Sequence, residues 1–365
     1  MSEFSISTIV GAAAFAAGLI FGATAQRTNF CTMGALSDIV FMGDWRRFRA
    51  WMLAVAVAMI GTQSLHGAGL IDLGKSIYLQ GPLVWAGAII GGLLFGFGMT
   101  LAGGCGNKTL VRIGAGNMKS LVTFLVIGLF AYMTLKGMIG LGRVQLEAAT
   151  NISVAGQAAN QGLPALLAAL GLSESLARWL VVGLIGGGLL VFCFKDAEFR
   201  TAPADILGGL IIGLMVPAGW WITGVLGADD FDPTALSSFT FVAPIGDTMM
   251  YLMTFTGSTI NFGIAAVGGV ICGSFLAARA GKGFRLEAFS DVADMRRHLI
   301  GAMMMGTGGV MAMGCTIGQG LTGISTLSAT SFIALAAIIF GGVWGLKSME
   351  EGSVGAGLKA VLARG

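Results

Sequence analysis

The stretch Met99-Thr-Leu-Ala-Gly-Gly-Cys-Gly-Asn-Lys-Thr-Leu-Val-Arg112 decides how this chain folds. It ends an apolar run in three glycines around Cys105 and begins a second run behind polar residues. Glycine is costly inside a helix, and irregular backbone survives at membrane depth only where protein or a water-filled cavity covers it. The sequence therefore predicts a broken helix that lines a site. A matching break, Met311-Ala-Met-Gly-Cys-Thr-Ile-Gly-Gln-Gly-Leu-Thr-Gly323, places Cys315 where Cys105 stands.

The composition indicates a helical protein that crosses a membrane several times. Of 365 residues, 55% are hydrophobic and only 11% are charged, whereas a soluble domain is roughly a quarter charged. The 60 glycines are typical of membrane helices that pack closely through small residues. Five cysteines without a C-x-x-C pair or a Cys/His cluster predict neither a metal site nor a disulfide framework. We expect no cofactor and no nucleic-acid partner, because no phosphate loop or basic stripe is present.

Apolar helical runs recur along the chain, and we expect an all-α membrane protein in which about nine of them cross the bilayer. The nine are Ile9–Ala25, Ala50–Leu65, Leu83–Leu101, Leu121–Leu135, Trp179–Phe194, Ile206–Leu226, Ile260–Ala278, Leu299–Met313 and Phe332–Leu346. Four stretches between them are too short to cross and are expected to form re-entrant helices. These are Asn29–Phe41, Cys105–Gly114, Ala243–Phe255 and Thr316–Ala329.

The basic residues predict an orientation, because Lys and Arg gather in cytoplasmic loops. With the N-terminus outside, the outer side receives four of them, Lys75, Lys136, Arg143 and Arg178. The inner side receives the other seventeen: Arg27, Arg46, Arg47, Arg49, Lys108, Arg112, Lys119, Lys195, Arg200, Arg279, Lys282, Arg285, Arg296, Arg297, Lys347, Lys359 and Arg364. The C-terminus is then expected inside.

The two halves of the chain repeat each other in opposite directions. Gly18-Leu-Ile-Phe-Gly22 matches Gly209-Leu-Ile-Ile-Gly213, and the run from Gly96 to Cys105 matches that from Gly306 to Cys315. Four spans lie in each half, and the odd span between them inverts the second half, a pattern that indicates a transport site at the repeat interface. We expect a first repeat over 1–140, an outer connection and joining helix over 141–200, an inverted second repeat over 201–350, and a short cytoplasmic tail over 351–365.

Three cysteine motifs resemble those of the YeeE/YedE family. They are Gln26-Arg27-Thr28-Asn29-Phe30-Cys31-Thr32-Met33-Gly34-Ala35, Gly103-Gly104-Cys105-Gly106 with Thr109-Leu-Val-Arg112, and Gly314-Cys-Thr-Ile-Gly-Gln-Gly-Leu-Thr-Gly-Ile-Ser325. The resemblance covers nearly the whole chain. It implies an hourglass of inverted repeats in the bacterial inner membrane that takes up thiosulfate or a related sulfur species. It also implies functional cysteines at Cys31, Cys105 and Cys315, with a periplasmic N-terminus and a cytoplasmic C-terminus.

The residues themselves favour passage of a sulfur anion. Thiols staggered across the bilayer can act as successive S–H donors, and soft sulfur suits a sulfane sulfur. Half-helix N-termini near Asn107 and Thr316 add unpaired N–H groups and a positive dipole end. We expect the substrate to be bound by Cys31, Cys105, Cys315, Asn107, Lys108, Thr109, Arg112, Thr316, Gln319 and Arg27. Alternatively, the three cations among these residues only obey the positive-inside rule.

Three functional hypotheses compete. The first is a transporter that passes thiosulfate inward along the three cysteines, with a separate cytoplasmic sulfur-carrier protein as a possible partner. The second keeps the architecture but moves selenium species or sulfite. The third is a membrane thiol–disulfide oxidoreductase that uses Cys105 and Cys315, which is disfavoured because no C-x-x-C pair accompanies them.

Overall fold

Helices form the framework of the protein. The computed structural model describes residues 5–153, 160–229 and 234–363, and within them it contains no β-strand beyond isolated bridges. Eight helical segments are long and apolar enough to cross a membrane, and they coincide with eight of the nine predicted spans. They are Ile6–Met42, Arg46–Gly67, Trp85–Gly114, Met118–Lys136, Glu174–Phe194, Pro203–Leu226, Phe262–Ala280 and Ala329–Glu350. The expectation of an all-α membrane protein is thereby confirmed.

The ninth predicted span, Leu299–Met313, differs from the other eight in the polarity of its first turns. The structure has a helix there, α15 (Val292–Met311), but it is not one of the eight apolar segments. Asp294, Arg296 and Arg297 fill its first turns, so that only the part after His298 is apolar. A helix with this pattern enters the membrane from a polar end and stops at the Cys315 break.

A short helix occupies each of the four stretches that we expected to be re-entrant. They are α2 (Thr32–Met42), α5 (Gly106–Gly114), α13 (Val242–Met253) and the π-helical turn η5 (Gly318–Gly323). Two of them continue a longer helix after a break, because α1 (Ile6–Thr28) precedes α2 and α4 (Trp85–Leu101) precedes α5. The glycine-rich breaks read from the sequence therefore stand between helices, as expected.

The other helices complete the bundle and its connections. They are α3 (Arg46–Gly67), η1 (Leu73–Lys75), α6 (Met118–Lys136), α7 (Met138–Thr150), α8 (Leu163–Ala168), α9 (Glu174–Val181), η2 (Val182–Gly186), α10 (Gly187–Phe194), α11 (Ala197–Arg200), α12 (Pro203–Trp221), η3 (Ile222–Leu226), η4 (Phe255–Gly257), α14 (Phe262–Ala280), α16 (Ala329–Glu350) and α17 (Val354–Leu362). Residues 154–159 of the expected outer connection and residues 364–365 of the expected tail lie outside the described part.

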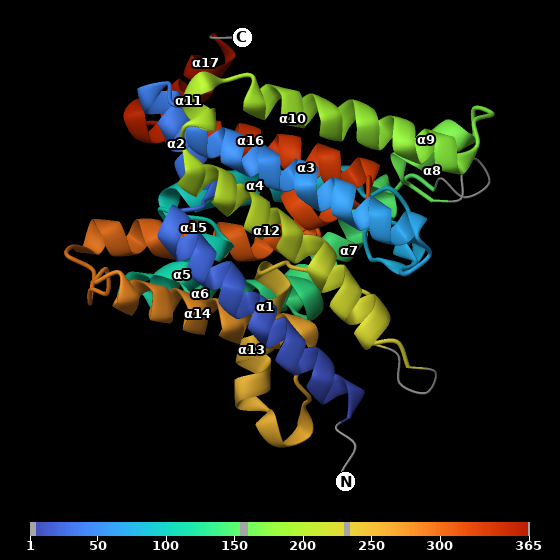
Figure 1. The fold of residues 1–365 in the computed structure, drawn as a ribbon. Helices are drawn as coiled ribbons and strands as arrows, with labels where there is room; N and C mark the ends of the chain where they lie inside the picture. Colours follow the sequence, from blue (N-terminus) through green and yellow to red (C-terminus); the bar gives the residue numbers. More distant parts are fainter. Residues whose placement is uncertain (1–4, 154–159, 230–233, 364–365) are drawn as a thin grey trace.

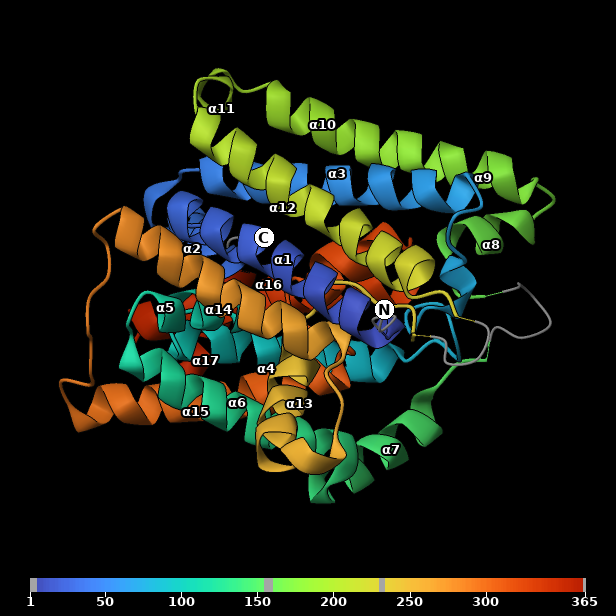
Figure 2. The same ribbon diagram turned by 60° about the horizontal axis from the view of Figure 1, so that its bottom comes forward.

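The long helices pack in pairs that correspond between the two halves (Figure 1). Helix α1 packs along α14 while α12 packs along α3, and α4 contacts α16 while α15 contacts α6. Figure 2 shows the first two pairs side by side in a second view. Exchanging the halves maps each pair onto the other. Two inverted repeats remain our proposal for the chain, and this paired packing supports it.

Glycines allow these pairs to approach at backbone distance. A methyl group on Gly22 of α1 would overlap the Val270 carbonyl of α14 and would lie only 2.8 Å from the Val270 Cα. A methyl group on Gly96 of α4 would lie 2.7 Å from the Gly342 nitrogen of α16. Because lipid tails are as apolar as leucine, such close van der Waals packing is a main source of cohesion between membrane helices.

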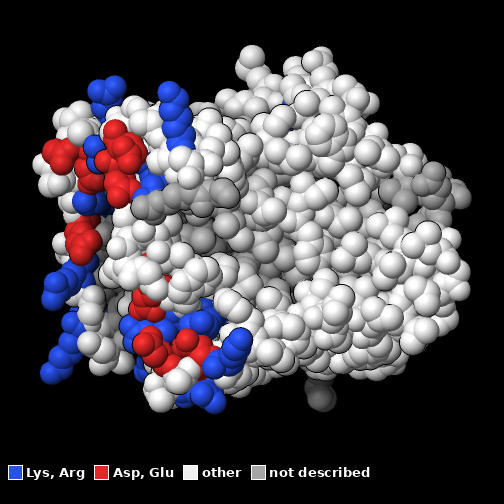
Figure 3. All heavy atoms as spheres, turned by 90° about the horizontal axis from the view of Figure 1, so that it is seen from above, with Lys and Arg blue, Asp and Glu red and all other residues white. Residues whose placement is uncertain are grey.

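Charged side chains gather at one end of the bundle (Figure 3), which we call the charged end. It holds the short helices α11 and α17 and the loop between α14 and α15, on the left in Figure 1. The face in Figure 3 is almost wholly uncharged away from that end. The opposite end carries α8 and the loop between α3 and α4.

The α1–α14 contact makes a testable prediction. We expect Gly22→Ala to lower the thermal midpoint of the purified protein, because overpacking a tight contact costs about 1–3 kcal/mol. Gly187→Ala is the matched control, since a methyl group there meets no atom within 4 Å. Equal melting of the two variants would show that the α1–α14 contact can relax without cost.

Candidate functional site

Each of the three predicted cysteines immediately precedes a short helix. Cys31 is the N-cap residue of α2 and Cys105 that of α5, and both have extended backbone. Cys315 stands three residues before η5. The first N–H groups of a helix have no partner within it. The breaks therefore place thiols beside the first-turn amides of short helices inside the protein.

The thiols lie closer together than the sequence suggested. The side chains of Cys31 and Cys105 are within hydrogen-bonding reach of each other, and the Thr316 hydroxyl lies beside the Cys105 thiol. The Cys315 sulfur accepts the Gly318 N–H at 3.4 Å. Cys31 and Cys105 are thus neighbours rather than widely staggered, and a left-handed turn at Asn29 (φ 52°) ends α1 just before Cys31.

Several buried polar atoms around these breaks lack a partner within the described structure. They are the Thr32 hydroxyl, both amide atoms of Asn107, the Thr316 hydroxyl and the Gln319 Oε1. An unpaired buried polar group costs about 1–3 kcal/mol, so this arrangement suits a site that a polar ligand fills. By contrast, the Thr109 hydroxyl donates to the Cys105 carbonyl at 3.1 Å, and the Gln319 amide donates to the Ala312 carbonyl. These two contacts hold the breaks in shape.

A polar vestibule of about 880 Å³ opens at the charged end and reaches Cys31. Six Lys or Arg residues and three Asp or Glu residues line it, so its field favours anions. The charged lining residues are Arg46, Arg47, Lys108, Arg112, Lys119, Arg285, Asp44, Asp205 and Glu287. Beside Arg46, which donates hydrogen bonds to it, the Asp44 carboxyl has its pKa lowered.

Three cations stand nearest the cysteines. Lys108 donates to the Asn29 Oδ1 at 3.0 Å, and Arg112 donates to the Gly103 carbonyl at 2.8 Å. Arg47 donates to Asp38 at 2.9 Å and to the Asn29 carbonyl at 2.8 Å. The sequence pointed to Lys108 and Arg112 but missed Arg47, whose only signal was a place in a basic loop.

Arg27 does not join the other predicted site residues. Its side chain is exposed, and it is not among the residues that line the vestibule, although Gln26 and Thr28 on either side are. Helix geometry accounts for this, because successive residues of α1 point about 100° apart. The positive-inside rule is sufficient to explain a basic residue at position 27, without a role in binding the substrate.

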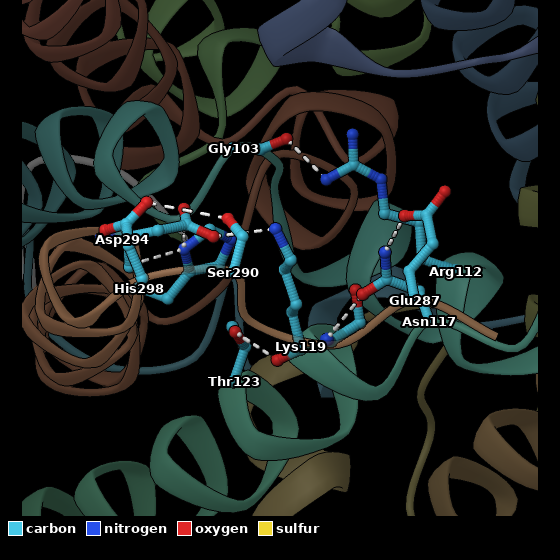
Figure 4. Close-up of polar contacts among 11 residues, drawn as sticks. Gly103, Arg112, Asn117, Lys119, Thr123, Glu287, Ser290, Asp294 and His298 are labelled. Carbon is cyan, nitrogen blue, oxygen red and sulfur yellow. Dashed lines mark hydrogen bonds and ion pairs between the residues drawn. The ribbon is translucent and has the colours of Figure 1, made fainter.

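The loop between α14 and α15 is bonded to the turn that follows α5 (Figure 4). The Arg285 N–H donates to the Ala115 carbonyl at 3.0 Å, and the Met118 N–H donates to the Glu287 carbonyl at 2.8 Å. Asn117 donates to the Glu287 carboxylate at 2.6 Å. No sequence signal could have paired these segments, which lie 170 residues apart.

Lys119 and Asp294 form an ion pair of 2.7 Å next to this loop. The hydrogen bond from Lys119 lowers the pKa of the Asp294 carboxyl. Asp294 therefore stays charged at neutral pH, and the pair ties α6 to the start of α15 (Figure 4).

The opposite end of the path is closed above Cys315, which is fully buried. Tyr78, also buried, packs edge to face on Trp220 with ring centroids 6.4 Å apart. The buried Gln161 amide donates to the Tyr78 carbonyl at 2.9 Å and accepts from the Thr330 hydroxyl. The Ala329 N–H donates to the Gln161 carbonyl at 3.1 Å. Gln161 thus fastens the loop before α4 to the start of α16.

A helical membrane bundle with broken helices, buried thiols at the breaks and a cationic vestibule at one end defines the class of the protein, a membrane transport protein for small anions. Known proteins agree with this class. The family model described as sulphur transport matches residues 27–344, and the chain belongs to that family. This match confirms the resemblance to the YeeE/YedE family.

Curated relatives extend over most of the chain. It is 29% identical over 342 residues to the "Thiosulfate transporter TsuA" of Escherichia coli (strain K12), covering 90% of this chain and 91% of that protein. It is 27% identical over 337 residues to the "Thiosulfate transporter TsuA" of Spirochaeta thermophila, covering 89% and 94%. A shorter match, 36% identical over 97 residues, covers 26% of this chain and 22% of the "Probable transporter YedE" of Escherichia coli (strain K12).

Membership of this family sets aside one hypothesis from the sequence. The family and the relatives are transporters, so the protein is a transporter and not a thiol–disulfide enzyme. Its five cysteines are all free thiols in the structure.

The open vestibule and the closed opposite end predict unequal thiol access. In protein carrying Cys193→Ala and Cys272→Ala, we expect a charged thiol reagent to modify Cys31 at least about tenfold faster than Cys315, because Cys31 lines the vestibule whereas Cys315 is fully buried outside it. Mass spectrometry of the digested protein measures both rates.

Removing the Gln161 contacts tests what closes that end. We expect Gln161→Ala to speed modification of Cys315, because Tyr78 and Thr330 lose their shared partner. Gln145→Ala, an exposed glutamine on α7, is the matched control and should leave Cys315 protected. Unchanged protection in Gln161→Ala would mean that the aromatic side chains close the path without it.

Proposed function

We propose that this protein takes up thiosulfate across the bacterial inner membrane, along a path formed by Cys31, Cys105 and Cys315. The two long relatives are thiosulfate transporters by name, which supports this substrate. The observation that carries the proposal is the meeting of thiols, helix N-termini and buried polar side-chain atoms without a partner at the end of a cationic vestibule. Thiosulfate offers oxygen atoms to the N–H and O–H donors and a soft terminal sulfur to the thiols.

The order of contacts follows from the geometry. An anion entering from the opposite end meets Cys315 first, where the Thr316 hydroxyl and the N-terminus of η5 can donate to it. It passes next to Cys105, which lies beside Thr316, and then to Cys31, which opens on the vestibule. Because neighbouring donors stand within hydrogen-bonding reach, the anion can exchange one partner for the next without losing all of them.

The charged end is then cytoplasmic. Lys and Arg gather in cytoplasmic loops, and Figure 3 shows where they gather here. This orientation puts the N-terminus in the periplasm and the C-terminus in the cytoplasm. It also makes the vestibule the exit, where cations draw the anion out of the membrane.

The cysteine path predicts loss of uptake without loss of protein. We expect Cys105→Ala and Cys105→Ser both to abolish growth on thiosulfate as sole sulfur source, in cells that lack other uptake routes. A hydrogen bond to a charged group contributes about 1.5–3 kcal/mol, so losing one weakens binding about tenfold or more. Serine should fail as well, because a hydroxyl lacks the soft sulfur contact.

Comparable losses are expected for Cys31→Ala and Cys315→Ala, while Cys193→Ala and Cys272→Ala are controls that should grow. Membrane levels of each variant are measured in parallel. Vesicles with purified protein and labelled thiosulfate, challenged with sulfate, sulfite or selenite, test the substrate directly. Full growth of the Cys105→Ala strain would remove the cysteine path from the mechanism.

Lys108 and Arg112, two of the six cations that line the vestibule, make a second prediction. Replacing Lys108 and Arg112 together by glutamine should weaken thiosulfate uptake at limiting substrate severalfold, because the exit loses two positive charges. Arg112→Lys should be milder than Arg112→Ala, since it keeps the charge. Arg27→Gln is the matched control, because Arg27 lies outside the vestibule lining. Unchanged uptake in the double variant would leave both residues with a purely topological role.

A further inference from the structure

His298 lines the vestibule and has no role in the path described so far. It lies on α15, and its side chain is 14% exposed. The Phe289 ring packs on it edge to face at 5.3 Å between centroids. Figure 4 shows it beside Asp294, near the Lys119 side chain. The chain has one other histidine, His66.

The hydrogen bonds of His298 fix which ring nitrogen carries a proton in its neutral form. Nδ1 lies 2.9 Å from the Asp294 carbonyl and 3.2 Å from the Asp294 carboxylate. A carbonyl oxygen and a carboxylate can only accept, so Nδ1 must be the donor. Nε2 is therefore an unprotonated acceptor in the neutral ring and becomes a donor only when the ring is charged.

Nε2 and the Arg112 guanidinium meet at one glycine. A methyl group on Gly103 would lie 4.0 Å from the His298 Nε2 and 3.6 Å from the Arg112 Nη1. Gly103 also has a positive φ of 67°, which strains other residues. The glycine keeps open a space between imidazole and guanidinium, two residues before Cys105.

Other titratable groups surround this space. On α15 itself, Asp294 faces His298, and Arg297 also acts on Asp294. From α6, Lys119 holds Asp294 as a carboxylate, and from α5, Arg112 faces the same glycine. The remaining titratable and charged groups in the vestibule lining are Cys31, Asp44, Arg46, Arg47, Lys108, Asp205, Arg285 and Glu287. The Asp294 carboxylate is already paired with Lys119, so a proton on His298 adds one net positive charge beside Arg112.

We propose that His298 is a proton-dependent ligand of the transported anion at the exit, acting together with Arg112; this inference rests on the proposed function. When Nε2 is protonated, it donates a hydrogen bond to the anion that Arg112 attracts. When Nε2 is bare, its lone pair faces the anion and the site weakens. Anion and proton therefore bind together, and a rise in pH releases both.

The sign of the pH effect follows directly. Below about pH 6 most histidine side chains are charged and above about pH 8 they are neutral, so anion binding should be tighter at the lower pH. We expect a ratio of about five- to tenfold, within the usual range of coupling between two sites. A neutral exit releases the anion into a cytoplasm near neutrality.

Isothermal titration of the purified full-length protein with sodium thiosulfate tests this at about pH 6 and about pH 8. His298→Gln should bind with equal, weaker affinity at both values. His66→Gln, in which the only other histidine is changed, should keep the wild-type ratio. His298→Lys, which keeps a positive charge at both pH values, should bind tightly at both. This variant still tests the inference if His298→Gln is too unstable to purify.

The outcomes separate the inference from the function on which it rests. A wild-type pH ratio in His298→Gln would assign the effect to Cys31 or a carboxylate and overturn the role of His298. Binding of equal strength at both pH values in the wild type would overturn it too. If neither the wild type nor any variant binds thiosulfate at either pH, the proposed function is overturned, and this inference with it.

Discussion

The first turn of a helix carries N–H groups that nothing within the helix can accept, and in a membrane no water reaches them. This constraint shapes the whole centre of the protein. Helices α2, α5 and η5 all begin there, so their open ends must be enclosed by other helices or by a ligand. Pairs such as α1 with α14 and α4 with α16 supply the enclosure, and glycines bring them close enough to do so. Tight packing and the site are thus two consequences of the same backbone requirement.

In the inverted repeat that we propose, corresponding positions of the two halves carry different side chains. Cys31 precedes α2, whereas the equivalent position before α13 is Phe241, which packs with Phe21 and Phe239. Lys108, three residues after Cys105, corresponds to Gly318 after Cys315. One end therefore holds a cationic vestibule, whereas near Cys315 the Tyr78 ring packs on Trp220 and the Tyr78 carbonyl accepts from Gln161. Under the proposed inverted repeat, these side chains give the scaffold its direction.

The sequence was a good guide wherever the signal was local. Glycines around Cys105 and Cys315 marked the breaks, and apolar runs marked eight of the spans, because both depend on neighbours in the chain. The ninth span, α15, is a helix as expected but is not among those eight segments, because Asp294, Arg296 and Arg297 make its first turns polar. The sequence could not indicate the importance of His298, of Gln161 or of the contact between Glu287 and Asn117. These residues matter through partners about 80 to 195 residues away in the chain. The sequence favoured Arg27, which precedes the Cys31 motif, over Arg47, whereas the structure places Arg47 and not Arg27 in the vestibule lining.

Under the proposed function, holding the cations in the open vestibule has an energetic reason. A full positive charge 4 Å from a dianion contributes about 8 kcal/mol at an effective dielectric constant of 20, enough to hold the anion rather than pass it on. Neutral donors such as the Thr316 hydroxyl and the helix amides stabilise it by a kilocalorie or so each and can be exchanged singly. Conduction requires sites that are favourable enough to enter yet weak enough to leave. Lys108 and Arg112 meet this requirement in the proposed path, because they face an open vestibule. There solvent and the carboxylates of Asp44 and Glu287 weaken their attraction for the anion.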